Sequence, residues 1–234
     1  MVCDVSTATG YDRRRHLRAR DFDAWMVAAR RYLPGPGGRV LDQGSGTGRF
    51  TVALAEATGA TVVACEPSAA LPAVCRAARP GHPIVGGKAP ATPFRAGAFD
   101  AIWASQVAHR VDDLAAFAGN VRRVLKPGGH LLLRGGFGPP GELPLYRYFP
   151  EAWAQGKEQI SEVLAAAGLH QSPHVPAESP DEFIDRARSR SLSNLAGLAD
   201  SVFQSGLRAM EQHAREGGMQ DRIVERLDLV VFHN

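Results

Sequence analysis

The stretch "VLDQGSGTGRF", Val40 to Phe50, places three glycines within five positions, directly after an apolar run and an acid. Gly44, Gly46 and Gly48 permit positive φ angles and carry no Cβ atoms, so a ligand can approach the backbone N–H groups of this turn. The apolar run predicts a short buried strand, and "RFTVALAEAT" (49–58) predicts a helix. A strand, a glycine turn and a helix in this order are typical of a site for a nucleotide-like ligand.

The same alternation of strand and helix continues along the chain. Apolar, β-branched runs predict further strands at 61–67, 83–88, 99–107, 130–137 and 225–232. Helical spacing of apolar residues predicts helices at 11–33, 68–80, 111–125, 151–169 and, as one or two helices, 181–216. Strands that are apolar throughout are buried on both faces. The sequence therefore predicts a doubly wound, mostly parallel sheet between two helical layers, a three-layer α/β/α fold.

Composition places the chain among globular proteins. Its 234 residues are 44% hydrophobic and 22% charged, with a net charge of +3, which suits one domain with a substantial core. The three cysteines lack metal-ligand spacing, and no metal is predicted. We find no apolar signal region at the N-terminus and no apolar run approaching the length of a membrane span, and we expect a cytoplasmic protein.

One basic cluster, "DRRRHLRARD" (12–21), raises the question of nucleic acid. Aromatic residues that would stack on bases do not interleave it, so a solvated helix face is favoured over an RNA contact.

Two acids indicate which class of ligand the turn binds. Asp42 ends the first predicted strand and Glu66 ends the second, where a carboxylate can accept two hydrogen bonds from a ribose diol. A nicotinamide-binding domain uses Gly-x-Gly-x-x-Gly to meet a pyrophosphate, whereas the spacing here is Gly-x-Gly-x-Gly behind an acid. Because that acid would repel a pyrophosphate and attract an ammonium group, the pattern indicates a ligand with a ribose and an amino-acid end, which is S-adenosylmethionine.

From Tyr11 to Phe137 the chain resembles the class I S-adenosylmethionine-dependent methyltransferases of the small-molecule type. The resemblance rests on "VLDQGSGTGRFT", "VVACEPSAAL", "APATPFRAGAFDAI" and "AHRV…RRVLKPGGHLLLRG". It implies a seven-stranded sheet in which 225–232 is the antiparallel strand near one edge. It also implies a single methyltransferase domain over 1–234, with a helical lid (11–33), a cofactor-binding core (34–137), a substrate-side insertion with helices (138–220) and a final strand (222–234).

The resemblance also implies roles for individual residues. Asp42 and the three loop glycines hold the methionine end, and Glu66 holds the ribose. The remaining cofactor contacts that it implies are Tyr11, Arg15, Pro67, Leu71, Ala89 and Gln106. One departure concerns adenine: the acid that often precedes the Ala89 position is replaced by Lys88, and Pro90 follows. Lysine only donates hydrogen bonds, so it cannot accept one from the adenine amino group.

The predicted substrate side differs from the cofactor side in composition. His109 follows the fourth predicted strand and suits general-base work or packing of that loop. The stretch "RGGFGPPGELPLYRYFP" (134–150) is rich in aromatic residues and arginine, which suits a planar or acidic small molecule. The candidate substrate-binding residues are Arg134, Phe137, Tyr146 and Tyr148.

We therefore expect methyl transfer from S-adenosylmethionine to a small-molecule acceptor, a hydroxyl or amine of a secondary metabolite, by in-line displacement. Two alternatives stay open: methylation of RNA or protein, and a cofactor-binding protein of this fold that transfers no methyl group. The protein is expected to act as a monomer or a homodimer, and the sequence does not distinguish the two.

Overall fold

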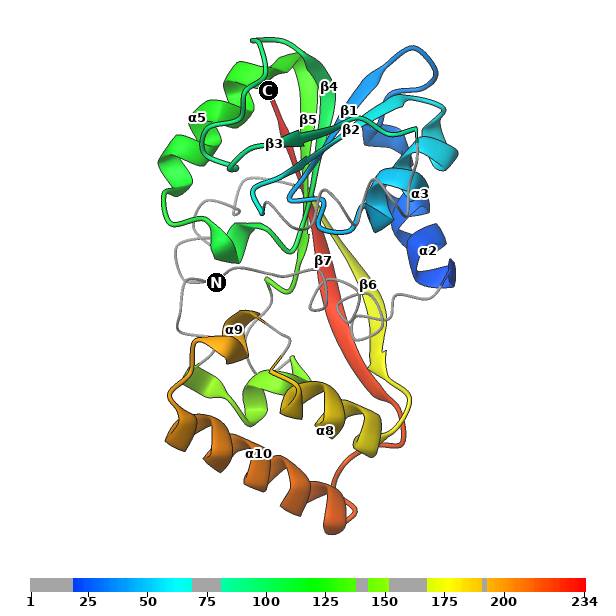
Figure 1. Ribbon diagram of the computed structural model, residues 1–234. Coiled ribbons are helices and arrows are strands. Elements are labelled where there is room, and N and C mark those ends of the chain that lie inside the picture. Colours follow the sequence, from blue (N-terminus) through cyan, green and yellow to red (C-terminus); the bar gives the residue numbers. More distant parts are fainter. Residues whose placement is uncertain (1–18, 69–80, 138–142, 152–167, 191–192) are drawn as a thin grey trace.

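The computed structural model describes the chain from residue 19 onward, except for residues 69–80, 138–142, 152–167 and 191–192. The described residues form one sheet in the order β3-β2-β1-β4-β5-β7-β6 (Figure 1). Its strands are β1 (Arg39–Gln43), β2 (Thr61–Glu66), β3 (Ile84–Gly86), β4 (Phe99–Ser105), β5 (Leu125–Gly135), β6 (Gly168–Ala177) and β7 (Ile223–His233). β3 spans three residues, and the other strands form the body of the sheet.

Strand directions confirm the predicted topology. β1 pairs in parallel with β2 on one side and with β4 on the other, and β4 pairs in parallel with β5. β7 is antiparallel to both β5 and β6. The sheet is therefore mostly parallel with one antiparallel strand. Its order reverses between β1 and β4, and in such sheets ligands bind at that reversal, beyond the carboxyl ends of the strands.

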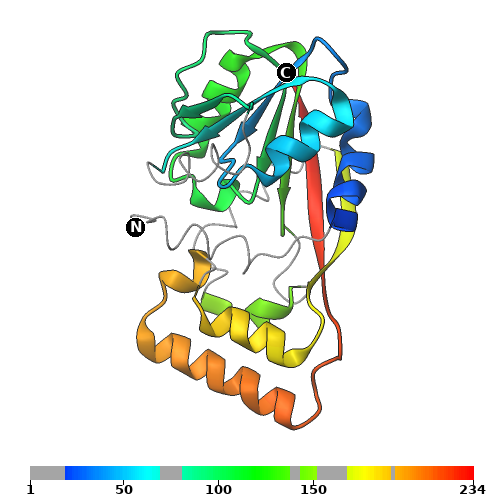
Figure 2. The same cartoon turned by 45° about the vertical axis from the view of Figure 1, so that its right-hand side comes forward.

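Helices cover both faces of the sheet, as a three-layer fold requires. α2 (Ala19–Ala29) and α3 (Arg49–Thr58) lie on one face, and α5 (Leu114–Val124) lies on the other (Figures 1 and 2). Successive residues of each strand point to opposite faces. Val40 accordingly packs in the α2–α3 core, while Leu41 packs in the α5 core.

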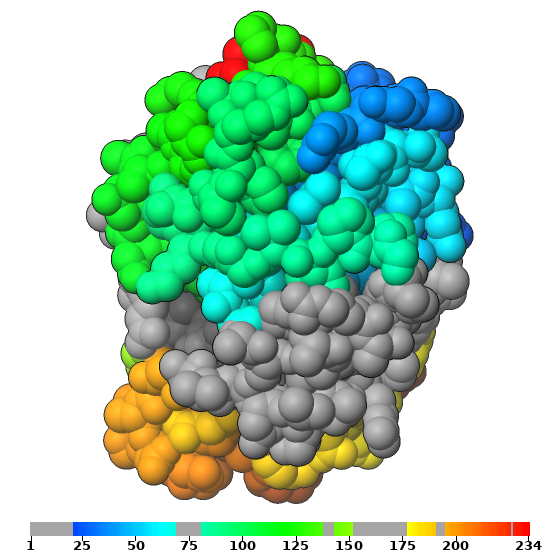
Figure 3. Space-filling view, turned by 45° about the horizontal axis from the view of Figure 1, so that its top comes forward, coloured from blue at the N-terminus to red at the C-terminus, as the bar shows by residue number. Residues whose placement is uncertain are grey.

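A second group of helices forms a cap beyond the carboxyl edge of the sheet. It comprises η4 (Pro144–Arg147), α8 (Pro180–Arg188), α9 (Ser193–Ala196) and α10 (Asp200–Arg215). Residues of these helices and Phe149, which follows η4, bury a separate apolar cluster that includes Phe183 and Met210. Figure 3 shows part of the cap, in yellow and orange, as a distinct bulge at the end of the molecule away from α5. The sequence predicted one or two helices over 181–216, whereas the described residues there form three, α8, α9 and α10.

Element boundaries depart from the sequence prediction most at β6 and β5. β6 begins at Gly168, within the end of the helix predicted at 151–169, and continues over residues 170–177, where the sequence indicated a loop or a ragged strand. We predicted a strand from His130, after a break at "PGG", but β5 begins at Leu125. The reason is an irregularity in the pairing of β5 with β4. The pairing with β4 shifts register between Phe99 and Ala101, and a Cβ atom at Gly129 would lie 2.9 Å from the carbonyl oxygen of Asp100. The glycines here allow the strand to continue closely against β4 instead of ending it.

Candidate cofactor site

The glycine turn sits where the sheet order reverses, between the end of β1 and the start of α3. Gly44, Gly46 and Gly48 have φ values of 69°, 57° and 79°, in the left-handed region that favours glycine. The N–H of Gly44 donates to the carbonyl oxygen of Cys65 over 2.7 Å, which ties the turn to β2. A Cβ atom at Gly44 would lie 2.5 Å from Val107 Cγ2, whereas one at Gly46 would meet nothing within 4 Å. The turn is therefore packed on one side and open on the other.

Asp42 lies behind this turn in a nearly dry position. Its side chain is buried, with 2% of the residue exposed, and the Thr51 hydroxyl donates to its Oδ2 over 2.6 Å. Burial raises the pKa of Asp42 to about 7, the Thr51 hydrogen bond opposes that rise, and the nearby charge of Glu66 adds to it. A buried carboxylate is strongly stabilised when a cationic ligand binds beside it.

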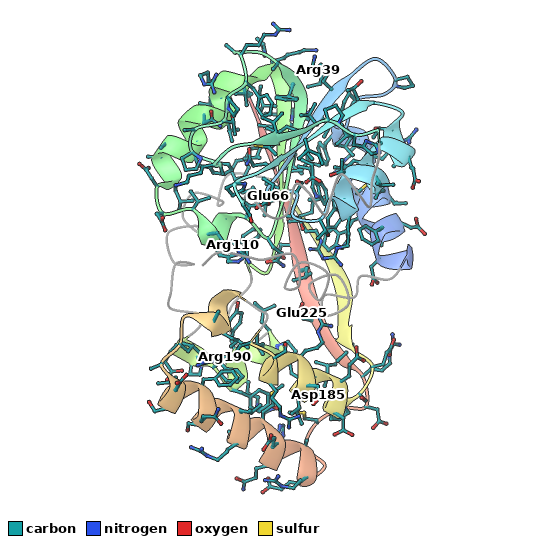
Figure 4. The ribbon with its side chains drawn as sticks, viewed as in Figure 1. Arg39, Glu66, Arg110, Asp185, Arg190 and Glu225 are labelled. Atoms are coloured by element: carbon teal, nitrogen blue, oxygen red, sulfur yellow. The ribbon has the colours of Figure 1, made fainter. Side chains whose placement is uncertain are left out.

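Glu66 ends β2 and faces the same turn. It is 7% exposed; Gly46 N–H donates to its Oε2 and Ser68 N–H to its Oε1, each over 3.0 Å. Figure 4 shows Glu66 and Arg110 at the edge of the sheet nearer to the cap. A carboxylate offers about four lone-pair positions, so these two contacts leave room for the two donors of a ribose diol.

The chain that follows β4 closes the site from the other side. Gln106 has a φ of 58°, a conformation that costs about 1 kcal/mol or more for a residue other than glycine. Its N–H donates to the carbonyl oxygen of Arg134 over 2.8 Å. Val107 then packs against Gly44, and the half-buried His109 follows in η2 (Ala108–Arg110). The structure thus places Gln106 and His109 in the segment that borders the glycine turn.

Ala89 belongs to a segment that α5 holds through a buried amide, which sequence analysis missed. The Asn120 side chain donates to the Ala89 carbonyl oxygen over 3.0 Å and to Thr92 Oγ1 over 2.9 Å. Arg123 donates to the Thr92 carbonyl oxygen over 2.9 Å. The signal in the sequence was an asparagine on the apolar face of a helix. A buried amide needs hydrogen-bond partners, so an asparagine at such a position indicates a buried network. Lys88 is exposed beside this network.

The predicted substrate residues divide between two places. Arg134 is 3% exposed; it donates to Ser105 Oγ over 3.1 Å and lies over the Trp25 ring at 4.7 Å. The half-buried Phe137 lies beyond the end of β5. Tyr146, by contrast, is part of the cap core, and the Tyr148 hydroxyl is hydrogen-bonded to His213 Nδ1 over 2.6 Å. Arg134 and Phe137 therefore border the carboxyl edge of the sheet, and the two tyrosines belong to the cap.

Some predicted contacts fall outside the described residues, namely Tyr11, Arg15, Leu71 and most of the basic cluster 12–21. Pro67 is described and exposed, one residue after Glu66. Across the part of the chain that the structure describes, no three histidine, cysteine or acidic side chains are arranged to hold a metal ion. Nor does any helix within that part combine the length and apolar character needed to cross a bilayer.

Comparison with known proteins shows the family of this chain. Residues 41–133 match a family model described as a methyltransferase domain. A demethylmenaquinone methyltransferase of a Mycobacterium species (strain KMS) is 31% identical over 186 residues, which cover 79% of this chain and 74% of that protein. The fold and site define a class I α/β protein that binds a nucleoside-type cofactor. The chain belongs to the S-adenosylmethionine-dependent methyltransferase family, whose cofactor is S-adenosylmethionine.

Other relatives cover less of the molecule. An uncharacterized methyltransferase of Mycobacterium tuberculosis is 36% identical over 132 residues, 56% of this chain and 51% of that protein. The chain thus spans about half the length of the first curated relatives that it matches.

Solved structures support the fold. One from Anabaena variabilis, provisionally named as a methyltransferase of an antibiotic biosynthesis pathway, has a TM-score of 0.67 at 20% identity and covers 93% of this chain and 98% of that one. A phosphoethanolamine N-methyltransferase of Haemonchus contortus, solved with S-adenosylhomocysteine, has a TM-score of 0.60 at 17% identity and covers 97% of this chain and 56% of that one.

Proposed function

We propose that this protein transfers a methyl group from S-adenosylmethionine to a small-molecule acceptor, a hydroxyl or amine of a secondary metabolite, in the cytoplasm. The observation that carries the proposal is the pair of buried carboxylates, Asp42 and Glu66, at the ends of adjacent strands on either side of an open glycine turn. One acid suits an ammonium group and the other a ribose diol. This arrangement favours a cofactor with an amino-acid end over a pyrophosphate.

The described residues fit the cofactor. Gly46 faces open space, and the buried Ser45 Oγ has no hydrogen-bond partner in the described part of the chain, as expected of a site built for a ligand. We assign Asp42 to the ammonium group, Glu66 to the ribose and the Ala89 backbone to adenine. Pro67 and Leu71 would flank the adenine, and Tyr11 and Arg15 would approach from the N-terminal segment.

The chemistry that the cofactor supplies is an activated methyl group on a sulfonium. The protein's main task is then to hold the acceptor in line with that methyl group and to exclude water. Gln106 borders the methyl position in this proposal. His109 would accept the proton of a hydroxyl nucleophile, since imidazole is the side chain most often used as a general base. Arg134 and Phe137 would contact the acceptor.

A second acceptor class has support from the relatives. The relative that matches most of this chain at 31% identity is named for demethylmenaquinone, a ring that bears oxygen substituents. A carbon or an oxygen of a reduced naphthoquinone is therefore a candidate acceptor beside an amine. RNA or protein is the alternative acceptor, and the basic cluster 12–21 and the basic pI of about 9.0 motivate it.

The test combines binding and transfer. Calorimetry with S-adenosylhomocysteine measures cofactor binding. Methyl-labelled S-adenosylmethionine with 1,4-dihydroxynaphthalene, 4-hydroxybenzoate and tyramine measures transfer, and a tRNA sample measures the nucleic-acid alternative. Glu66→Gln should weaken S-adenosylhomocysteine binding by about tenfold to 100-fold, because a charged hydrogen-bond acceptor is lost.

Glu56→Gln, on the exposed side of α3, is the matched control and should bind as the wild type does. The proposal is wrong if the wild-type protein does not bind S-adenosylhomocysteine. Binding without transfer to any acceptor favours the non-transferring alternative.

A further inference from the structure

Asp228 is a buried acid that the cofactor site does not use. It lies near the middle of β7 and is 2% exposed. The Phe137 N–H donates to its Oδ2 over 2.8 Å. Its Oδ1 is also buried and accepts no hydrogen bond within the described part of the chain. A buried carboxylate oxygen without a donor destabilises the folded protein, so this group needs an explanation beyond packing.

The contact with Phe137 does not require an acid. An asparagine at position 228 would accept from the Phe137 N–H through its carbonyl oxygen and would carry no charge. Holding the chain after β5 therefore requires neither the negative charge of Asp228 nor its second oxygen. A buried polar atom without a partner in a native protein requires an explanation, and a bound partner or a role in the reaction is one of the recognised kinds.

The position of Asp228 points to the acceptor side. In the sheet it pairs with Gly135, the last residue of β5. The residue before, Arg134, pairs with Ser105 at the end of β4 and accepts a hydrogen bond from Gln106 N–H. Asp228 thus lies along the same carboxyl edge as the segment assigned to the methyl group, one strand beyond β5.

Alternation along β7 gives the face. Leu227 and Leu229 belong to the α2–α3 core, and Val230 belongs to the α5 core, so Asp228 faces the α5 side. Further back along the strand, Ile223 belongs to the cap cluster, and Figure 4 shows Glu225 on the stretch of β7 that approaches the cap. Asp228 therefore stands between the α5 core and the cap cluster, at the level where β5 ends and where β6 and β7 continue toward the cap.

We propose that Asp228 is a substrate-binding residue whose Oδ1 accepts a hydrogen bond from the methyl acceptor. The group that it recognises is an O–H or N–H donor, neutral or cationic, on the acceptor. A carboxylate or phosphate at that position would be repelled by the acid. This inference rests on the proposed function and narrows its substrate class to acceptors that present a donor toward β7.

The test uses Asp228→Asn in the full chain, because the amide keeps the Phe137 contact and removes the charge. We expect unchanged affinity for S-adenosylhomocysteine, a thermal midpoint higher by about 2–4 °C, and transfer to the best acceptor of the panel reduced by about tenfold to 100-fold. The matched control is Asp113→Asn. Asp113 also accepts from a backbone N–H, that of Ala116 over 2.8 Å, but at the exposed start of α5, and its loss should leave transfer unchanged.

The outcomes separate this inference from the proposed function. A wild-type protein that binds no S-adenosylhomocysteine overturns the proposed function, whatever Asp228 does. A lower thermal midpoint in Asp228→Asn overturns the inference and shows a structural role, and this measurement needs no acceptor. A raised midpoint with undiminished transfer also overturns it. A raised midpoint with reduced transfer and unchanged cofactor binding supports it.

Discussion

Replacing Asp42 by asparagine removes a buried acid whose pKa lies at about 7, against an ordinary value of 3.8. The difference of about 3 pKa units corresponds to about 4 kcal/mol, at 1.36 kcal/mol for each unit. Burial is the main cause of the raised value, and the charge of Glu66 adds to it. The ionised form of Asp42 therefore destabilises the empty protein, and Asp42→Asn should increase its free energy of unfolding above neutral pH by an amount approaching that magnitude.

The sign of the pH dependence follows from the two states. At pH values between 3.8 and about 7, the unfolded chain has released the Asp42 proton and the folded chain still holds it. The free energy of unfolding of the wild type then falls as the pH rises through this window, and the loss is complete above about pH 7. Asp42→Asn lacks this contribution, so the advantage of the variant should vanish below about pH 4 and be greatest at pH 8.

Urea unfolding of both proteins at pH 4, 5.5, 7 and 8.5 measures the effect. Asp100→Asn is a control of opposite sign. Although partial burial acts to raise the pKa of Asp100, hydrogen bonds from Lys126 and from the Arg39 N–H hold it below its usual value. Asp100→Asn should therefore lower the free energy of unfolding, and only at pH values above the ordinary pKa range of an aspartate side chain. Parallel pH profiles for the wild type and Asp42→Asn would refute the reasoning. The stabilised variant should also bind S-adenosylhomocysteine more weakly, because an amide does not attract the ammonium group.

The remaining predictions concern the glycine turn and the segment behind it. Gly46→Ala should cost about 1 kcal/mol of stability, from its positive φ alone, and should weaken S-adenosylhomocysteine binding in calorimetry because its methyl group enters the open space. Gly44→Ala should lower the thermal midpoint further, since its Cβ would lie 2.5 Å from Val107 Cγ2; equal midpoints for the two variants would contradict this. Asn120→Ala should cost about 1–3 kcal/mol in urea unfolding, because the hydrogen bond to the Ala89 carbonyl oxygen is lost, and should raise KM for the cofactor more than it changes kcat.

The cofactor half was predictable because its signals are local. Three closely spaced glycines, Gly44, Gly46 and Gly48, indicate positive φ angles. The helix that follows them was predicted at 49–58, and the structure has α3 at Arg49–Thr58. Continuous apolar strands then required helices on both faces. Asp42 and Glu66 could be paired in advance because each ends a strand, and parallel strands end at one edge.

The acceptor side was less predictable because its contacts are remote in sequence. Asp228 touches Phe137 across 91 positions, and Asn120 touches Ala89 across 31. Such contacts depend on the register of strands and the angle of a helix, which no local pattern specifies. Arg134 shows the same dependence, since its packing against Trp25 joins β5 to α2, a contact that no local pattern specifies.

The place of β7 in the sheet has a consequence for synthesis on the ribosome. β7 is the last of the seven strands along the described chain, yet it lies between β5 and β6. Until residues 223–233 emerge, β5 has an unpaired edge and β6 has no partner strand. An exposed edge of this kind can pair with other chains. The nascent protein thus passes through a period in which the parallel strands are complete and still open to aggregation, and the antiparallel strand ends that period by joining the sheet to the cap.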